Sequence, residues 1–184
     1  MNSKLIQIGY NADADRQEND LYCTNPKMVE LLLQYEKFSP NIWEPCNGLS
    51  HISDTLRDNG YNVRKSDILS YNQDDVEIMD FLETNETFDG DIVTNPPYKN
   101  VEKYIYKALE SANKVAMLLK VNILATQKRK KLFDAYPPKT VYVLSKRYMC
   151  AKNGEFEKYG NGAVDYVWII WEKDFKGDSV IKWI

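Results

Sequence analysis

A tetrapeptide of unusual composition, Asn95-Pro96-Pro97-Tyr98, directly follows the short apolar stretch Asp91–Thr94. Consecutive prolines restrict the backbone, so the Asn95 side-chain oxygen and the Pro96 carbonyl can point to one place. Two acceptors there can bind the two hydrogens of an exocyclic amino group. Tyr98 adds a flat face on which a planar base can stack. We therefore interpret these residues as a candidate catalytic site; the alternative is a rigid turn that only ends a strand.

A second candidate site is Glu44-Pro45-Cys46-Asn47-Gly48-Leu49-Ser50, which follows the apolar residues Ile42 and Trp43. In open α/β sheets, ligands bind beyond the carboxyl ends of the strands. A carboxylate at that edge can accept hydrogen bonds from a ribose or an ammonium group, and Gly48 lets the backbone approach a ligand closely. An ordinary helix-starting turn fits the same pattern, so this motif alone is weak evidence of a site.

The elements that must position these motifs alternate along the chain. Apolar spacing predicts helices at 26–37, 49–59, 101–112 and 123–136. It predicts strands at Asn41–Glu44, 61–65, Asp91–Thr94, Lys114–Lys120, 140–144 and 164–171, and it leaves 76–82 open between helix and strand. This order indicates an α/β fold with a mainly parallel sheet covered on both faces. The last two strands have no helix between them and are expected to pair antiparallel.

Length and composition favour one domain over residues 1–184, because 184 residues with 43% hydrophobic and 28% charged residues are typical of a single globular unit. The three cysteines and His51 do not have the spacing of a metal site, so no metal is expected. No long apolar run or apolar signal core is present, which predicts a cytoplasmic protein without a membrane span.

Charge is distributed unevenly along the chain. Segment 74–91 contains eight acidic residues and no basic one, whereas segment 120–152 contains nine basic residues and only Asp134 as an acid. Solvated helix faces and loops would account for either block alone. Together they predict a polarised molecule with one basic side, which suits a polyanionic substrate.

In its two motifs and in their order, the chain resembles the S-adenosylmethionine-dependent N6-adenine DNA methyltransferases of the Asn-Pro-Pro-Tyr type, in a compact form like those of phages and mobile elements. The resemblance implies a Rossmann-like methyltransferase sandwich, with a mostly parallel seven-stranded sheet and an antiparallel C-terminal strand pair. It also implies S-adenosyl-L-methionine as cofactor. The implied reaction is methylation of N6 of adenine in DNA, with the base flipped into the site.

The resemblance carries roles onto particular residues of this chain. Segment 22–26 corresponds to the part that closes over the methionine moiety, and Asp67 stands where the ribose is held. Catalysis is assigned to Asn95, Pro96, Pro97 and Tyr98. Cofactor binding is assigned to Tyr22, Thr24, Glu44, Pro45, Gly48, Asp67, Asp80, Phe81 and Asn95.

Three positions near the cofactor motif need separate interpretation. Ser50 stands where the family usually has a second glycine, so close backbone approach is not expected there. His51 is expected to be exposed or to pack on its helix, and Cys46 to be a small turn residue, because amine methylation needs no covalent enzyme intermediate.

DNA contact is assigned to the long segment 145–163, with Tyr98 on the base and Lys146, Arg147 and Lys152 on phosphates. No separate target-recognition domain is expected, which leaves a homodimer or a separate specificity partner open. The tetrapeptide also resembles that of glutamine-N5 protein and guanine-N2 RNA methyltransferases. A binding module that keeps the fold without turnover is a third alternative.

Overall fold

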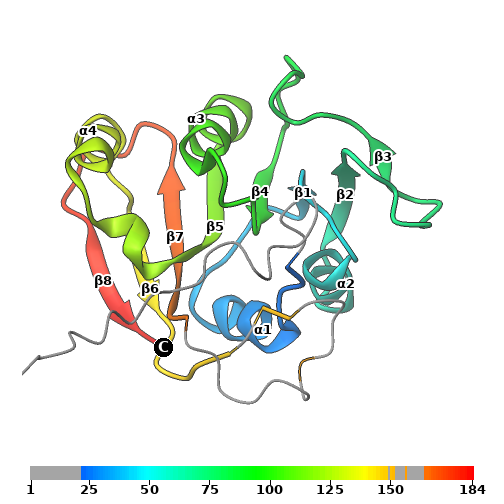
Figure 1. Cartoon of the computed structure of the whole chain (residues 1–184), viewed down its shortest axis with the longest axis horizontal. Coiled ribbons are helices and arrows are strands. Elements are labelled where there is room, and N and C mark those ends of the chain that lie inside the picture. Colours follow the sequence, from blue (N-terminus) through cyan, green and yellow to red (C-terminus); the bar gives the residue numbers. More distant parts are fainter. Residues whose placement is uncertain (1–21, 149, 152–155, 157–163) are drawn as a thin grey trace, which may run out of the picture.

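The computed structural model describes residues 22–148, 150–151, 156 and 164–184. These residues form an eight-stranded sheet with the order β3-β2-β1-β4-β5-β7-β6-β8 (Figure 1). The strands are β1 (Asn41–Glu44), β2 (Asn62–Asp67), β3 (Glu77–Ile78), β4 (Asp91–Thr94), β5 (Lys114–Lys120), β6 (Thr140–Val143), β7 (Tyr166–Glu172) and β8 (Val180–Trp183). The helices are α1 (Pro26–Tyr35), α2 (His51–Asp58), α3 (Val101–Ser111), the short 3-10 helix η2 (Val121–Leu124) and α4 (Gln127–Ala135).

The strand directions agree with the sequence prediction, but the number of strands does not. Strand β7 runs antiparallel to both of its neighbours, β5 and β6, and the other strands run parallel to one another. The expected antiparallel C-terminal pair is therefore β6–β7. The predicted number of seven strands is wrong, because β8 pairs parallel to β6 as an eighth strand. Val180, Ile181 and Trp183 of β8 are at least half exposed, so this strand has no buried face for a sequence pattern to reveal.

The sheet is covered on both faces, with α1 and α2 on one face and α3 and α4 on the other (Figure 1). On the first face, Met28 and Leu32 of α1 pack around Trp168, whose indole nitrogen donates to the Met28 carbonyl at 3.0 Å. On the second face, Ile105 of α3 packs with Trp43 and other sheet residues. Two buried faces explain why β4, β5 and β7 are apolar along most of their length.

Two helices begin later than the sequence predicts, because a residue near each predicted start has a positive φ. The helix expected from residue 49 begins at His51, since Ser50 is left-handed with φ of 64°. The helix expected over 123–136 is divided: η2 ends at Leu124, Thr126 has φ of 102°, and only then does α4 begin. Segment 76–82, left open by the sequence, contributes the two-residue strand β3.

The topology brings the two candidate motifs to one edge of the sheet. Strands β1 and β4 are parallel neighbours, with Ile42 opposite Asp91 and Trp43 opposite Ile92. The chain continues from β1 toward β2 on one side and from β4 toward β5 on the other, so the strand order reverses between them. Ligands bind at such a switch point, beyond the carboxyl ends of the strands.

Candidate functional site

A cleft of about 740 Å³, counting its open mouth, lies at this edge. Ligand sites of α/β folds occur at this place, in the crevice beyond the carboxyl ends of the strands. The cleft brings together every residue assigned from the sequence to cofactor binding or catalysis: Tyr22, Thr24, Glu44, Pro45, Gly48, Asp67, Asp80, Phe81, Asn95, Pro96, Pro97 and Tyr98.

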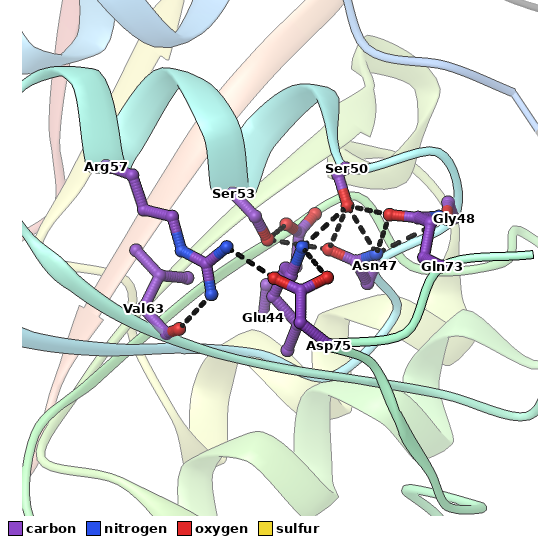
Figure 2. A network of polar contacts seen from close by, with 10 residues as sticks. Glu44, Asn47, Gly48, Ser50, Ser53, Arg57, Val63, Gln73 and Asp75 are labelled. Carbon is purple, nitrogen blue, oxygen red and sulfur yellow. Dashed lines mark hydrogen bonds and ion pairs between the residues drawn. The ribbon is translucent and has the colours of Figure 1, made fainter. Parts of the chain in front are cut away.

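The loop after β1 is held by a dense polar network (Figure 2). The Ser53 hydroxyl of α2 donates to the Glu44 carboxylate and lies 2.7 Å from Asn47 Oδ1. Asn47 Nδ2 in turn donates to Ser50 Oγ at 2.9 Å. Gln73 closes the loop from outside, because its Nε2 donates to the Gly48 carbonyl at 2.8 Å while its Oε1 accepts from Ser50. The loop conformation is therefore fixed by the protein itself.

A buried lysine supports this network from β2. Lys65 is 5% exposed, and its Nζ lies 3.2 Å from Ser50 Oγ and 2.6 Å from Asp75 Oδ1. Arg57 of α2 reaches the other oxygen of Asp75 at 2.7 Å. Hydrogen bonds from Arg57 and Lys65 lower the pKa of Asp75 to about 2. Figure 2 shows the Asp75 carboxylate beside Arg57. Because the Asp75 side chain is about half exposed, it supports the buried Lys65 from the solvent side.

Ser50 stands where the resembled family usually has a second glycine, and its side chain stabilises the loop at this position. Its φ of 64° lies in the left-handed region, which costs a residue with a side chain about 1–2 kcal/mol. The same side chain is buried and bonded to Asn47, Lys65 and Gln73. These contacts offset the backbone cost and hold the conformation that glycine would adopt without them.

Two buried carboxylates face the cleft from β1 and β2. Asp67 accepts from the Gly48 amide at 2.8 Å and from the Leu69 amide at 3.2 Å. Burial raises the pKa of Asp67, and it raises the pKa of Glu44 well above its usual range. A ligand that brings hydroxyl donors or a positive charge would favour the ionised form of both groups.

An aromatic wall follows β3. Phe81 is 2% exposed, lies edge-to-face with Trp43 at 5.2 Å and stacks with Tyr104 at 6.4 Å between ring centroids. Asp80 beside it accepts from the Leu82 amide at 2.9 Å and so supports the turn. Sequence reasoning missed Tyr104, which lines the cleft from α3, because only the tertiary structure brings that helix to Phe81.

Ile68 and Tyr71 are two further lining residues that the sequence interpretation did not name. Ile68 directly follows the acid that ends β2, so its position could have been inferred from Asp67. Tyr71 has a left-handed φ of 49°, and no residue pattern pointed to it.

The Asn95 amide has one satisfied end and one unsatisfied end. Its Nδ2 donates to Thr24 Oγ1 at 3.0 Å and to the Tyr22 carbonyl at 3.3 Å, with Cys150 Sγ at 3.8 Å. Its Oδ1 is buried and accepts no hydrogen bond from the residues that the structure describes. Because the amide nitrogen is committed to acceptors, the orphaned oxygen is an acceptor held in a fixed direction.

A two-residue bridge supports this arrangement. Cys23 and Ala151 exchange both backbone hydrogen bonds at 3.0 Å. Two segments far apart in the sequence therefore meet at Asn95, and both contribute groups that contact its amide nitrogen.

Tyr98, the last residue of the motif, also lines the cleft. Burial raises the pKa of its phenol well above the usual range, so the hydroxyl stays protonated. Lys120 Nζ lies 4.2 Å from the ring centroid, and the Tyr22 ring lies 6.2 Å away at an interplanar angle of 33°.

Comparison with solved structures identifies the fold. A candidate class I S-adenosylmethionine-dependent methyltransferase from Listeria monocytogenes superimposes with a TM-score of 0.62 at 14% identity, over 93% of this chain and 68% of that one. The chain has a Rossmann-like methyltransferase fold. The fold expected from the sequence is thereby confirmed, with the eighth strand as an addition.

Two other solved structures share this methyltransferase fold. The 23S rRNA methyltransferase ErmE matches with a TM-score of 0.53 at 13% identity, over 85% of this chain and 72% of that one. The M protein of the type I restriction enzyme EcoKI matches with a TM-score of 0.57 at 11% identity, over 89% of this chain and 45% of that one. No protein-family model matches the sequence, and no curated protein matches it.

Lys146 and Arg147, two of the three residues assigned to DNA phosphates, do not line the cleft of this methyltransferase fold. Lys146 Nζ lies 5.5 Å from the Tyr148 ring centroid, and Arg147 Nε is 2.9 Å from Asp165 Oδ1. Both border a separate small hollow of about 150 Å³. Lys152, with most of the second half of segment 145–163, lies outside the described residues.

Cys46 and His51 line the cleft of the methyltransferase fold. Burial raises the pKa of the Cys46 thiol well above its usual range, so the thiolate needed for nucleophilic attack is disfavoured. Burial lowers the pKa of His51, which packs edge-to-face against Phe156 at 5.3 Å. His51 was expected to be exposed or to pack on its helix; it is half-buried, and this ring contact is with Phe156 from a distant segment. Cys46 contributes to the cleft wall as well as to the turn.

Among the described residues, no three His, Cys, Asp or Glu side chains gather as a metal site would require. No described helix has the length and apolar content to cross a membrane.

Proposed function

We propose that this protein is an S-adenosylmethionine-dependent methyltransferase that modifies the exocyclic N6 of adenine in DNA. The observation that carries the proposal is the buried, unpaired Asn95 Oδ1 at the start of Asn95-Pro96-Pro97-Tyr98, inside the cleft. Leaving a buried acceptor unsatisfied costs about 1–3 kcal/mol. A substrate that brings an N–H donor to that atom removes this cost.

The cleft residues fit the proposed cofactor in their chemistry. Asp67 can accept hydrogen bonds from ribose hydroxyls, and Glu44 can balance a positive charge on the methionine part. Asp80 and the Phe81–Tyr104 wall suit the polar edge and flat face of the adenine ring. When bound, S-adenosylmethionine supplies a methyl group on a sulfonium sulfur, which keeps the electron pair of the broken C–S bond as the N–C bond forms.

The acceptor side of the proposal depends on two oxygens and one ring. Asn95 Oδ1 and the Pro96 carbonyl accept the amino hydrogens of the target, which draws the nitrogen lone pair out of conjugation with the base. Tyr98 supports the base from its face, as in enzymes that flip a nucleotide out of the duplex. The displaced amino proton passes to solvent. The chain's contribution is then orientation and electrostatic positioning, without a covalent enzyme intermediate.

DNA is proposed as the acceptor because a restriction-enzyme M protein shares the fold and because segment 120–152 is strongly basic. Within this proposal residues 1–184 act as a single catalytic domain in the cytoplasm, and a second copy or a separate partner supplies target specificity.

The direct test is incubation with cofactor carrying a radiolabelled methyl group, in parallel with adenine-containing DNA, structured RNA and a glutamine-bearing protein. The proposal predicts label at N6 of adenine in DNA, and none with the Asn95→Ala variant. Label on RNA guanine or on protein glutamine would move the activity to another acceptor. Binding of the cofactor without transfer to any acceptor would support a non-catalytic module instead.

A further inference from the structure

Helix α4 carries four basic residues, and the structure separates them by their contacts. They are Lys128, Arg129, Lys130 and Lys131. Arg129 faces the protein: its side chain is only 23% exposed, lies 3.4 Å from Glu102 Oε1 and donates to the Asn122 carbonyl at 2.7 Å. Lys130 is paired with Asp134 one turn later in the same helix, at 2.5 Å. Arg129 therefore anchors the helix, and the charge of Lys130 is balanced within it.

Lys128 and Lys131 are the two residues of α4 whose charge faces solvent without a close partner. The Lys128 side chain is 80% exposed, and its ion pair with Glu102 spans 3.8 Å, so solvent screens most of that interaction. Lys131 is exposed as well, and none of the ion pairs among the described residues includes it. Residues three positions apart are neighbours on a helix surface. The two ammonium groups therefore share one exposed face of α4.

The start of α4 lies at the same edge of the sheet as the cleft. Strands β4 and β5 are parallel, so their carboxyl ends meet at that edge, and β5 continues through η2 into α4. The first turn of α4 also contacts Glu102, which is four residues after Tyr98 and belongs to the first turn of α3. Helix α4 is thus held next to the segment that carries Asn95-Pro96-Pro97-Tyr98.

The cleft itself has no cationic residue with which to hold a polyanion. Its charged lining consists of Glu44, Asp67 and Asp80, and no lysine or arginine is among the described residues that line it. Duplex DNA carries about one negative charge per 1.7 Å of its axis, so these acids would repel it. Arg147, expected from the sequence to contact phosphates, is paired with Asp165 at 2.9 Å. The phosphates of a DNA substrate therefore need another cationic surface near the cleft.

We propose that Lys128 and Lys131 form a docking surface for the phosphate backbone of DNA beside the target base. This inference rests on the proposed function and deepens it, because it names the surface that holds the duplex while the cleft holds the base. The Cβ atoms of the two lysines are about 5–6 Å apart, as is usual at this helical spacing, so their flexible side chains can reach neighbouring phosphates. Such contacts position the duplex and do not read its sequence.

The test measures DNA affinity across a series of salt concentrations. Each phosphate contact contributes about 0.9 to the slope of log affinity against log salt on duplex DNA. Replacing Lys128 and Lys131 together by Ala should flatten the slope by about 1.8, and replacing both by Arg should keep it. The matched control replaces the exposed Lys173 and Lys176 by Ala. These two residues follow β7, which runs antiparallel to β5 and so ends at the opposite edge of the sheet. The control should keep the parental slope.

A kinetic readout separates DNA contact from support of the catalytic motif. Alanine is a strong helix former, so the α4 double variant should fold like the parent, as urea unfolding can verify. Its KM for DNA should rise while kcat and cofactor affinity stay at the parental values, because a phosphate contact is made equally in the ground state and the transition state. A lower kcat with the parental slope would show that Lys128 acts through Glu102 on the motif, and would overturn the docking surface.

The remaining outcomes distinguish this inference from the proposed function. Equal flattening in the control pair would reduce the effect to net charge and overturn the proposal. If the parent transfers no methyl group to adenine but binds DNA with a slope that depends on Lys128 and Lys131, adenine methylation is wrong and the docking surface stands. If the parent methylates DNA adenine and the α4 double variant keeps its slope, only the docking surface is wrong. A change of slope on RNA alone would overturn the DNA contact.

Discussion

The two sides of the cleft differ in how completely their polar groups are paired. On the side of β1 and β2, Asn47, Ser50, Gln73 and Asp67 bond to one another or to the loop backbone. On the side of β4 and β5, Asn95 Oδ1 has no partner among the described residues. The polar network that holds the loop after β1 is therefore formed before any ligand arrives, whereas Asn95 Oδ1 is satisfied only by a ligand that brings an N–H donor.

This difference indicates which part of the cleft already has its final shape without a ligand. A paired loop retains its shape when empty, which reduces the ordering cost of binding. An unpaired acceptor gives discrimination instead, because only a donor of matching geometry removes its desolvation cost. We infer that the first side provides affinity for a cofactor and the second side selects the atom that reacts.

The largest expected effect follows from removing the unpaired acceptor. Asn95→Ala should lower the rate of methyl transfer by about 10²–10³-fold or more, as when a single transition-state hydrogen bond is removed. Cofactor affinity, measured by calorimetry, should be nearly unchanged, and the exposed Asn85→Ala serves as control. Equal loss of transfer and of cofactor affinity would show that Asn95 is structural.

The next effect concerns the acid at the end of β2. Asp67→Ala should weaken cofactor binding by about 1.5–3 kcal/mol, the value of a charge-assisted hydrogen bond. Calorimetric titration measures this loss, with the exposed Asp178→Ala for comparison. Because Asp67 also bonds the Gly48 amide, Asp67→Asn should retain part of the affinity. An unchanged dissociation constant in the alanine variant would refute the ribose assignment.

Ser50 tests whether its network offsets its backbone cost. Ser50→Ala keeps the left-handed cost but loses the hydroxyl contacts, whereas Ser50→Gly loses the contacts and also relieves the cost. We expect the alanine variant to be less stable than the glycine variant by about 1 kcal/mol in urea unfolding. Equal stabilities would mean that the left-handed backbone is not under strain.

The smallest effect belongs to Asp75, which is 55% exposed although its partner Lys65 is buried. Asp75→Asn should reduce stability by about 1 kcal/mol, below the value for a fully buried pair because solvent screens one partner. The folded pKa is about 2 and lies below the unfolded value. The stabilisation is thus present above roughly pH 4 and is lost as the pH falls toward 2.

Denaturant unfolding of the parent and of Asp75→Asn at pH 6 and pH 2.5 measures this dependence. The difference between the two proteins should shrink at the lower pH. A difference that is the same at both values would contradict the ionic role of Asp75.

The sequence predicted the elements that depend on local pattern. Strands β1 and β5 were predicted with the observed bounds, because the apolar residues of each are bounded by polar or turn residues. The sequence placed Glu44, Asp67 and Asn95 at or directly after the ends of three strands, and the strand order β2-β1-β4 is a finding of the structure. Their shared cleft followed from parallel strands having their carboxyl ends at one edge.

What the sequence missed depends on contacts between distant segments. Strand β8 is exposed along its length and depends on backbone pairing with β6. The Lys65–Ser50 contact joins β2 to the loop after β1, and the Lys120–Tyr98 contact joins β5 to the loop after β4. Such pairs leave no periodic signal in a single sequence, so only the folded chain shows them.

The central claim, methylation of adenine N6 in DNA, is tested most directly by long-read mapping of methylated adenine after expression in a host without DNA methylation. The parental protein is expected to deposit N6-methyladenine within a defined sequence context, and Asn95→Ala, expressed to the same level, to deposit none. Unmodified adenines throughout the genome, with the parental protein folded and able to bind its cofactor, would contradict the account.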